Sequence, residues 1–169
     1  MPTDPTISAE LRRHAHSEHP LLICDSERLT YAEADRRSAA LARGLLAAGA
    51  GRGTHVGLLY PNGGAFVVAM LAATRIGAVV VPLSTFSTVT ELQAQLTSAD
   101  IEILLSTNAY RGNDYRSRLA GNSAASVPSL RRICFDTDRL VRLGASVAPA
   151  VLDACEDAVD GGDTLGYDY

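Results

Sequence analysis

The chain has 169 residues, of which 47% are hydrophobic, and a formal net charge of −4. This size and composition suit one domain with a hydrophobic core, or part of a larger domain. The negative charge balance disfavours nucleic acid as a partner. All 15 basic residues are arginine, which excludes from these residues any mechanism that needs a lysine, including a lysine-bearing phosphate loop or a Schiff base.

Cysteine usage and hydropathy favour a cytoplasmic protein with no membrane span. Cys24, Cys134 and Cys155 are widely spaced and fit neither a disulfide framework nor a metal knuckle. The opening Met-Pro-Thr-Asp-Pro lacks the profile of a signal peptide, and the longest apolar run, residues 65–73, is too short to cross a bilayer. We therefore expect a cytoplasmic location.

The first elements in chain order are short. Ser8 is a suitable cap for a helix that runs to about Ala15. Residues 21–24 and 28–30 are apolar or β-prone runs around a turn and predict a small hairpin. Three neighbouring histidines lack i, i+4 spacing, so we interpret them as a solvated helix end rather than a metal site; they are His14, His16 and His19.

Two helices and a strand follow the hairpin. Thr30 and Glu33 match a capping box that opens a helix ending at Gly49. The glycines of residues 49–53 precede the strand 54–60, the reverse of a dinucleotide-binding order, so they predict a simple connection. Asn62 then caps an apolar helix over residues 65–76. Gly63 and Gly64 at its start are able to bind phosphate, but no basic residue is adjacent, and we favour a structural role.

The strongest single signal is the run from Arg75 to Phe86. Gly77 closes a helix in the left-handed conformation, and residues 78–81 form an unbroken apolar run typical of a strand covered on both faces. Pro82 cannot donate to a ladder, so the strand ends there. The next residues therefore leave the carboxyl end of the strand, where ligands of open α/β sheets bind.

The remaining elements continue the alternation of helix and strand. Thr88 and Glu91 form a second capping box, followed by a helix to about residue 100 and the strand 101–105. This order predicts an α/β fold with a largely parallel sheet flanked by helices. A short helix over 114–119, a loop over 121–129, a strand over 130–135 and a helix over 150–159 follow, and Glu156 and Asp157 are expected to be solvated rather than a cation site.

Four stretches in this order resemble the N-terminal part of an acyl-CoA synthetase of the adenylate-forming, AMP-binding superfamily. They are residues 29–33, 51–62, 75–83 and 91–105. Ala34 and Thr54 depart from the family pattern, and residues 110–115 are similar to a subgroup that carries Ser-Thr-Phe after Pro-Leu. The resemblance covers roughly residues 20 to 135 and implies the fold of the family's N-terminal subdomain.

The resemblance implies a reaction and its cofactors. In this family a carboxylic acid is adenylated with ATP and Mg, and the acyl group is then transferred to coenzyme A. For this chain the expected substrate is a fatty acid. Residues 163–169 resemble the strand before the family's ATP phosphate loop, but neither that loop nor a catalytic lysine is present, and no Gly-x-Ser-x-Gly elbow substitutes for them. We expect a truncated or partial ligase, inactive alone; whether it binds any cofactor by itself is left open.

The expected organisation has three parts and leaves three functions open. An N-terminal arm and short helix (1–19) precede an α/β core (20–135), and a helix and terminal strand (136–169) end where the phosphate loop would begin. The chain is then the inactive N-terminal segment of a ligase, the docking subunit of a split ligase with a complementary chain, or a stand-alone binding or interaction module. Exposed sheet and helix faces also predict self-association.

The resemblance further implies a coenzyme A contact. It places Ser84, Thr85 and Arg111 near the nucleotide end of the coenzyme. Independently of the family, these residues follow two predicted parallel strands, and a guanidinium fork suits a phosphate. The alternative is that Ser84 and Thr85 only turn the chain and Arg111 only faces water.

Overall fold

The computed structural model describes residues 5–25, 27–120 and 126–166. Its helices are α1 (Ile7–Arg13), α2 (Tyr31–Ala47), α3 (Gly64–Arg75), α4 (Val89–Ser98), α5 (Tyr115–Leu119), α6 (Thr137–Gly144) and α7 (Pro149–Ala158). Its strands are β1 (Pro20–Cys24), β2 (Glu27–Thr30), β3 (His55–Leu59), β4 (Val79–Pro82), β5 (Ile103–Ser106), β6 (Ala109–Tyr110), β7 (Asn113–Asp114) and β8 (Arg132–Cys134).

The central sheet has four parallel strands in the order β4-β3-β5-β8. Val56 of β3 lies opposite Val80 of β4 on one side and Ile103 of β5 on the other. The predicted α/β fold with a largely parallel sheet is therefore confirmed. β1–β2 and β6–β7 form two separate antiparallel hairpins, of which the first was predicted.

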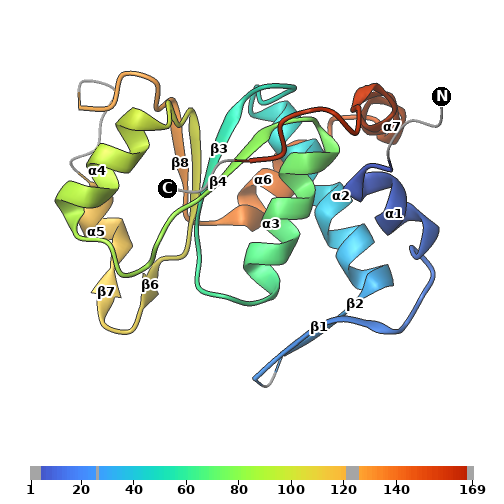
Figure 1. Cartoon of the computed structure of the whole chain (residues 1–169), viewed down its shortest axis with the longest axis horizontal. Helices are drawn as coiled ribbons and strands as arrows, with labels where there is room; N and C mark the ends of the chain where they lie inside the picture. The colour runs from blue at the N-terminus through green and yellow to red at the C-terminus, as the bar shows by residue number, and fades with distance from the viewer. Residues whose placement is uncertain (1–4, 26, 121–125, 167–169) are drawn as a thin grey trace.

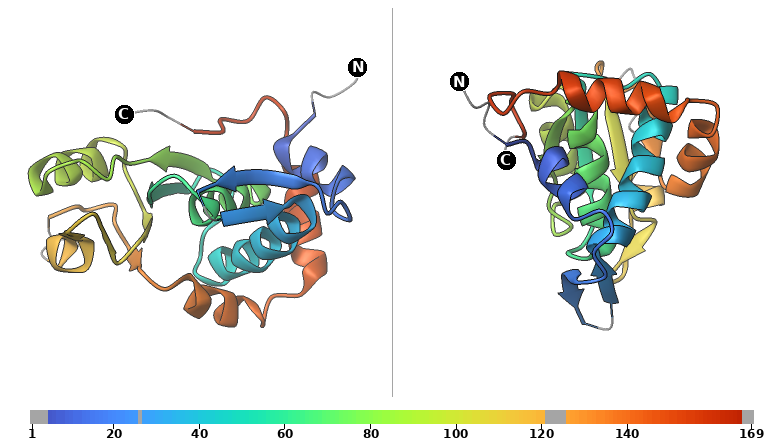
Figure 2. Two further views of the ribbon diagram at one scale, coloured as in Figure 1. Left: turned by 90° about the horizontal axis from the view of Figure 1, so that it is seen from below. Right: turned by 90° about the vertical axis from the view of Figure 1, so that its right-hand side faces the viewer.

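Each face of the sheet contributes to its own hydrophobic core, because successive strand residues point to opposite faces. On one face, residues such as Val56, Val80 and Ile103 pack with α1, α2, α3, α6 and α7. On the other face, Leu59 and Leu104 pack with α4 and α5. Figures 1 and 2 show the two groups of helices on opposite sides of the sheet.

The predicted buried strand is present at β4. Gly77 has a φ of 67°, the left-handed conformation that closes α3, and the amide of Ala78 bonds back to the carbonyl of Ala73. The side chains of Val79, Val80 and Val81 are buried, with Val80 only 4% exposed. The prediction of a strand covered on both faces is confirmed.

The two predicted capping boxes differ in the structure. At α4, Thr88 caps the amide of Glu91, and the Glu91 carboxylate accepts from the Thr88 amide, so this box is complete. At α2, Thr30 caps the amide of Glu33 at 3.1 Å, but the Glu33 carboxylate pairs instead with Arg37 one turn later. The prediction that Glu33 completes this capping box is therefore wrong.

The starts of α1 and α3 also correct the sequence prediction. Thr6, not Ser8, caps α1, because its hydroxyl accepts from the amide of Ala9 at 3.1 Å. At α3 the capping residue is Gly63 rather than Asn62. The carboxylate of Glu27 from β2 accepts from the amide of Gly64 at 2.8 Å, so an internal anion occupies this helix N-terminus. This contact agrees with the structural role favoured for the two glycines.

Helix α6 was not predicted, although its charged and apolar residues segregate as in an amphipathic helix and Asp136 caps its first turn. It crosses α2 at Gly44 and Gly144, where the two backbones touch. A Cβ added at Gly44 would lie 2.4 Å from the carbonyl oxygen of Leu140, and one at Gly144 would lie 2.4 Å from the amide nitrogen of Gly44. Close approach therefore explains both glycines.

The C-terminal part only partly matches the predicted strand. The amide of Val80 donates to the carbonyl of Leu165 at 2.9 Å, and Val80 forms an isolated parallel bridge with Gly166. Residues 163 and 164 are not in a strand, so the predicted strand 163–169 is wrong at its start; its residues 167–169, and most of the loop predicted at 121–129, lie outside the described residues. No helix in the described part of the chain is long and apolar enough to cross a membrane.

Candidate functional site

The carboxyl ends of the parallel strands meet at one edge of the sheet, the lower edge in Figure 1. The loop from Leu83 to Thr88 leaves β4 there, and the hairpin of β6 and β7 follows β5. Parallel strands direct these connections to the same edge, which is where open α/β sheets bind ligands. We call this region the strand-end site; it comprises residues 83–88 and 109–118.

Ser84 and Thr85 both lie in this site but differ in exposure. Ser84 is exposed, and its hydroxyl accepts from the amide of Phe86 at 3.2 Å. Thr85 is buried, and its carbonyl accepts from the hydroxyl of Tyr115 at 2.6 Å. Phe86 points outward and is 75% exposed. Ser84 and the backbone are therefore more available to a ligand than the Thr85 side chain.

Arg111 lies at the tip of the β6–β7 hairpin with a φ of 46°. Gly112 follows with a φ of 79°, and two consecutive positive φ values are typical of the tight turn that joins twisted strands. The exposed guanidinium of Arg111 lies 5.3 Å from the ring centre of Tyr110. Among the described residues it binds no carboxylate or carbonyl, so its N–H groups are open to an anion.

Two further arginines of the site have protein acceptors. Arg116 donates to the side chain of Asn108 and lies over the ring of Phe135. Arg118 donates to the carbonyl of Ser87 at 3.4 Å and to the side-chain oxygen of Asn113 at 2.6 Å. The sequence prediction did not assign a role to either residue, because their acceptors lie in other elements or across the hairpin.

Helix N-termini near the site hold two carboxylates with lowered pKa values. The hydroxyl of Ser117 donates to the Asp114 carboxylate and is the largest cause of its lowered pKa; the amide of Ser117 also donates and lowers this pKa further. The amide of Thr88 donates to the Glu91 carboxylate and is the largest cause of its lowered pKa, and the hydroxyl of Thr88 adds to the effect. Both carboxylates are exposed and cap their own helices, so they are occupied structurally.

Two side chains near the ends of β3 and β8, Tyr60 and Cys134, are in a form that is unsuited to act as a nucleophile. Burial, with a further contribution from nearby Cys134, raises the pKa of the Tyr60 hydroxyl above its ordinary value. Burial likewise raises the pKa of the Cys134 thiol, although Arg132 and Arg139 oppose the change. Both groups are therefore protonated at neutral pH, which is the unreactive form.

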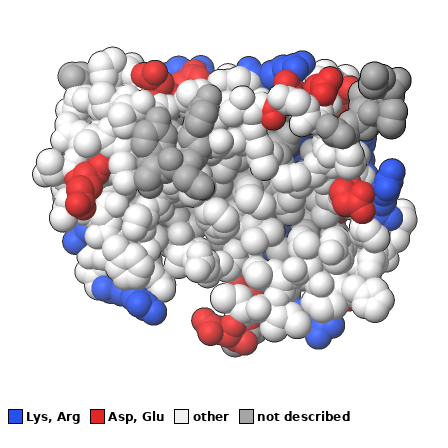
Figure 3. All heavy atoms as spheres, viewed as in Figure 1, with Lys and Arg blue, Asp and Glu red and all other residues white. Residues whose placement is uncertain are grey.

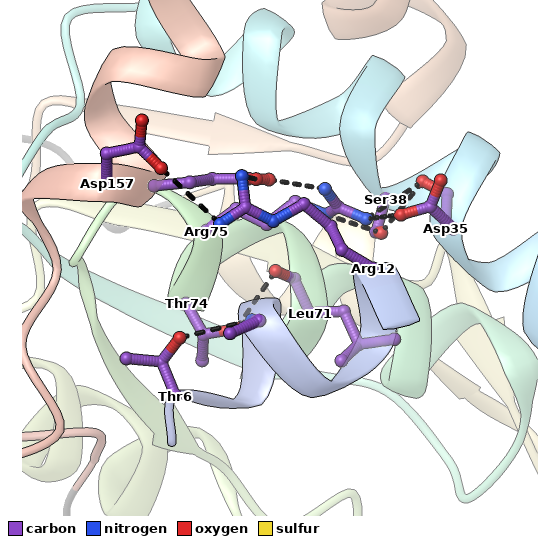
Figure 4. Close-up of polar contacts among 10 residues, drawn as sticks. Thr6, Arg12, Asp35, Ser38, Leu71, Thr74, Arg75 and Asp157 are labelled. Atoms are coloured by element: carbon purple, nitrogen blue, oxygen red, sulfur yellow. Dashed lines mark hydrogen bonds and ion pairs between the residues drawn. The ribbon is translucent and has the colours of Figure 1, made fainter. Parts of the chain in front are cut away.

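A second cluster of charges is buried between the helices on the other side of the molecule (Figure 4). Arg75 of α3 is 3% exposed and donates to the hydroxyl of Ser38 at 3.0 Å and to the carboxylates of Asp35 and Glu156. Arg12 of α1 also pairs with Glu156, at 3.0 Å. We call these five residues the Arg75 cluster.

The Arg75 cluster corrects the prediction for the acidic residues of α7. Asp157 is exposed as expected, but the side chain of Glu156 is only 1% exposed and has two arginine partners. Its role is to join α7 to α1 and α3, because a buried carboxylate requires compensation by cations. Within the described ranges no group of histidine, cysteine or acidic side chains forms a metal site, and His14 pairs with Glu10 at 3.4 Å.

A parallel sheet with helices on both faces and connecting loops gathered at the strand ends defines an α/β ligand-binding architecture. Comparison with protein families narrows this class. The family model of the AMP-binding enzymes matches residues 10–159. The chain therefore belongs to the AMP-binding enzyme family, and its likeness to the N-terminal part of acyl-CoA ligases is confirmed.

Relatives and solved structures agree with this assignment. The chain is 34% identical over 130 residues to a dioxo-octahydroindenyl-propanoyl:CoA ligase of Mycobacterium tuberculosis, covering 76% of this chain and 25% of the relative. It is 43% identical over 79 residues to a feruloyl-CoA synthase of Amycolatopsis, covering 47% of this chain and 16% of the relative.

The structural comparison concerns the fold. The N-terminal domain of FACL13 from Mycobacterium tuberculosis matches with a TM-score of 0.74 and 24% identity, over 96% of this chain and 41% of that chain. A fatty acyl CoA synthetase of the same organism matches with a TM-score of 0.75 and 24% identity, over 97% of this chain and 32% of that chain. The chain spans about a quarter of the length of the first curated relative.

Proposed function

We propose that this chain is a partial acyl-CoA ligase whose strand-end site contacts the nucleotide end of coenzyme A. The parent reaction is ATP-dependent adenylation of a carboxylic acid, assisted by Mg, followed by thioester formation with coenzyme A. The observation that carries the proposal is the family match, combined with an unoccupied guanidinium at the strand-end site. Names of matched proteins include a fatty acyl CoA synthetase and a feruloyl-CoA synthase; a fatty acid is our first candidate substrate.

The contact proposed for coenzyme A uses the exposed groups of the site. The guanidinium of Arg111 suits a phosphate, since its N–H fork matches two phosphate oxygens. The hydroxyl of Ser84 and the backbone around Thr85 complete the contact with donors or acceptors. Because the site is open to solvent, its affinity is expected to be weak.

A calorimetric titration tests this contact. Coenzyme A, and then its form without the 3′-phosphate, are titrated into the wild-type chain and into Arg111→Ala. We expect weak binding to the wild type that falls about tenfold or more when either the arginine or the 3′-phosphate is removed, since a charge-assisted pair is worth roughly 1.5–3 kcal/mol. Arg142→Ala is the matched control, because Arg142 is an exposed arginine on distant α6. Equal affinity in all combinations, or no binding to the wild type, contradicts the contact.

We expect the chain alone to catalyse no ATP–pyrophosphate exchange. The reason is that its 169 residues contain no lysine and no loop of the kind that embraces the ATP phosphates in this family. The measurement is exchange of labelled pyrophosphate with fatty and aromatic acids, with an intact ligase as the positive control. Exchange clearly above a buffer blank would show that these residues hold a complete adenylation site.

We further propose that a complementary chain or a second copy covers part of the surface. Figure 3 shows one face with its arginine and acidic side chains mostly near the margin and few charges in the middle. Large apolar side chains are exposed among the described residues, including Phe86 of the strand-end site and the neighbouring Val89. Such surfaces associate with other chains.

Light scattering over a range of protein concentrations tests this association. We expect the mean mass to rise with concentration and the double variant Phe86→Asp, Val89→Asp to lower it, because charges disfavour burial of that patch. Variant Arg28→Asp, at an exposed site on the β1–β2 hairpin, serves as the control for added negative charge. A monodisperse monomer at high concentration would remove the proposal.

A further inference from the structure

The two halves of the strand-end site are joined by Tyr115, a residue that belongs to neither the loop nor the hairpin strands. Tyr115 is the first residue of α5, immediately after β7, and is completely buried. Its hydroxyl donates to the carbonyl of Thr85 at 2.6 Å. A short hydrogen bond inside the core therefore fixes the middle of the Leu83–Thr88 loop to the base of the hairpin.

Arg118 makes a second connection between the same two segments. It lies one turn after Tyr115 on α5 and donates to the carbonyl of Ser87 and to the side chain of Asn113 in β7. The loop is thus held at residues 85 and 87 from the side of α5. Between them, Phe86 points outward and its amide bonds to the hydroxyl of Ser84.

We infer that Tyr115 and Arg118 are positioning residues of the strand-end site, which hold the Leu83–Thr88 loop and the Arg111 hairpin as one rigid unit. The inference rests on the proposed function for the identity of the ligand, but the rigid unit itself rests only on the hydrogen bonds of Tyr115 and Arg118. A ligand that bridges Ser84 and Arg111 then meets a surface already ordered, which lowers the entropic cost of binding.

Both residues act through others rather than through the ligand. Tyr115 has no exposed surface with which to contact a ligand. The donors of Arg118 that the structure shows are directed to protein acceptors, in contrast to those of Arg111. Removing either bond should therefore loosen the relation between loop and hairpin while the ligand-facing groups stay present.

The first test is amide hydrogen exchange of the free protein. Tyr115→Phe keeps the buried ring and removes only the hydroxyl donor, and Tyr31→Phe on α2 is the matched control for loss of a tyrosine hydroxyl. We expect Tyr115→Phe to speed exchange at Phe86 and Ser87 about five- to tenfold, the effect of losing one net hydrogen bond. The amides of β3 and β5 should be unchanged. Unchanged exchange in the loop, or equal acceleration throughout the sheet, overturns the inference.

The second test is the affinity for coenzyme A. We expect Tyr115→Phe and Arg118→Met to weaken binding severalfold at a nearly unchanged melting temperature, and Arg118→Lys to restore part of it, because lysine still donates to one acceptor. Unchanged affinity in a variant with faster loop exchange overturns the positioning role. If the wild type binds no coenzyme A, the proposed ligand is wrong, and the exchange experiment alone decides whether loop and hairpin form one unit.

Discussion

Replacing Arg75 with methionine is expected to destabilise the protein by about 3–5 kcal/mol, because one partner of a buried ion pair is removed and the other stays. The methionine keeps the aliphatic contacts of the arginine stem, while the guanidinium that joins Asp35, Ser38 and Glu156 is lost. Glu156, with a side chain 1% exposed, then retains only the partly exposed Arg12 as a cation partner among the described residues. Such a loss is large against a typical total stability of about 5–15 kcal/mol.

Urea unfolding followed by circular dichroism measures this change. We expect the midpoint for Arg75→Met to fall by at least about 1 M, given usual slopes of about 1–3 kcal/mol per molar urea. Arg142→Met is the control, because Arg142 is 70% exposed and lies 3.8 Å from Asp136; its effect should stay within about 0.5 kcal/mol. The double variant Arg75→Met, Glu156→Met should recover part of the loss, since apolar groups replace a charge pair. An Arg75→Met midpoint equal to wild type would contradict the structural role of the cluster.

Replacing Val80 with aspartate is expected to prevent folding at neutral pH. Val80 is in the centre of β4, and its side chain packs in the core formed with α2 and α3. The change removes about 1.5–3 kcal/mol of apolar burial and places an isolated carboxylate where no cation can compensate it. The two costs together approach or exceed the stability of a typical domain.

Thermal unfolding with a matched valine-to-aspartate change tests this second prediction. Val151 on α7 is 48% exposed, so Val151→Asp should melt cooperatively within a few degrees of wild type. Val80→Asp should instead show no cooperative transition. A Val80→Asp chain that melts at the wild-type temperature would mean that β4 is not the buried strand described above.

The sequence predicts best where local signals decide the structure. The apolar run of β4, the turn at Gly77 and the complete cap of α4 depend on residues next to each other, and all were predicted. Helix α6 was missed although its cap and amphipathic pattern are local; what the sequence does not show is its position against α2, which depends on the approach of Gly44 and Gly144, far apart in the chain. The prediction that Asn62 caps α3 was wrong for a similar reason. The group that accepts from the first turn of this helix is the carboxylate of Glu27, which lies in a separate hairpin.

In the candidate site, too, the features that depend on neighbouring residues were predicted, and those that depend on distant contacts were not. Ser84, Thr85 and Arg111 were selected because they follow strands, and the structure places all three in the strand-end site, although it gives Thr85 a buried side chain. Tyr115 ends the stretch 110–115 that resembles a family subgroup, but its role was not predicted, because that role depends on a carbonyl 30 residues earlier. Arg75 was visible only as a helix-end arginine, and its burial depends on partners from α2 and α7.

The bonding of β4 also limits how this chain can aggregate. The amides of Val79 and Leu83 bond inward to the carbonyls of Thr54 and Leu58, and by alternation those of residues 80 and 82 face the outer edge. The Val80 amide is bonded to Leu165, and Pro82 has no N–H. Between residues 79 and 83, a foreign strand approaching this edge therefore finds carbonyls but no free donor. Amyloid-like growth by strand addition is therefore disfavoured at this edge of the sheet.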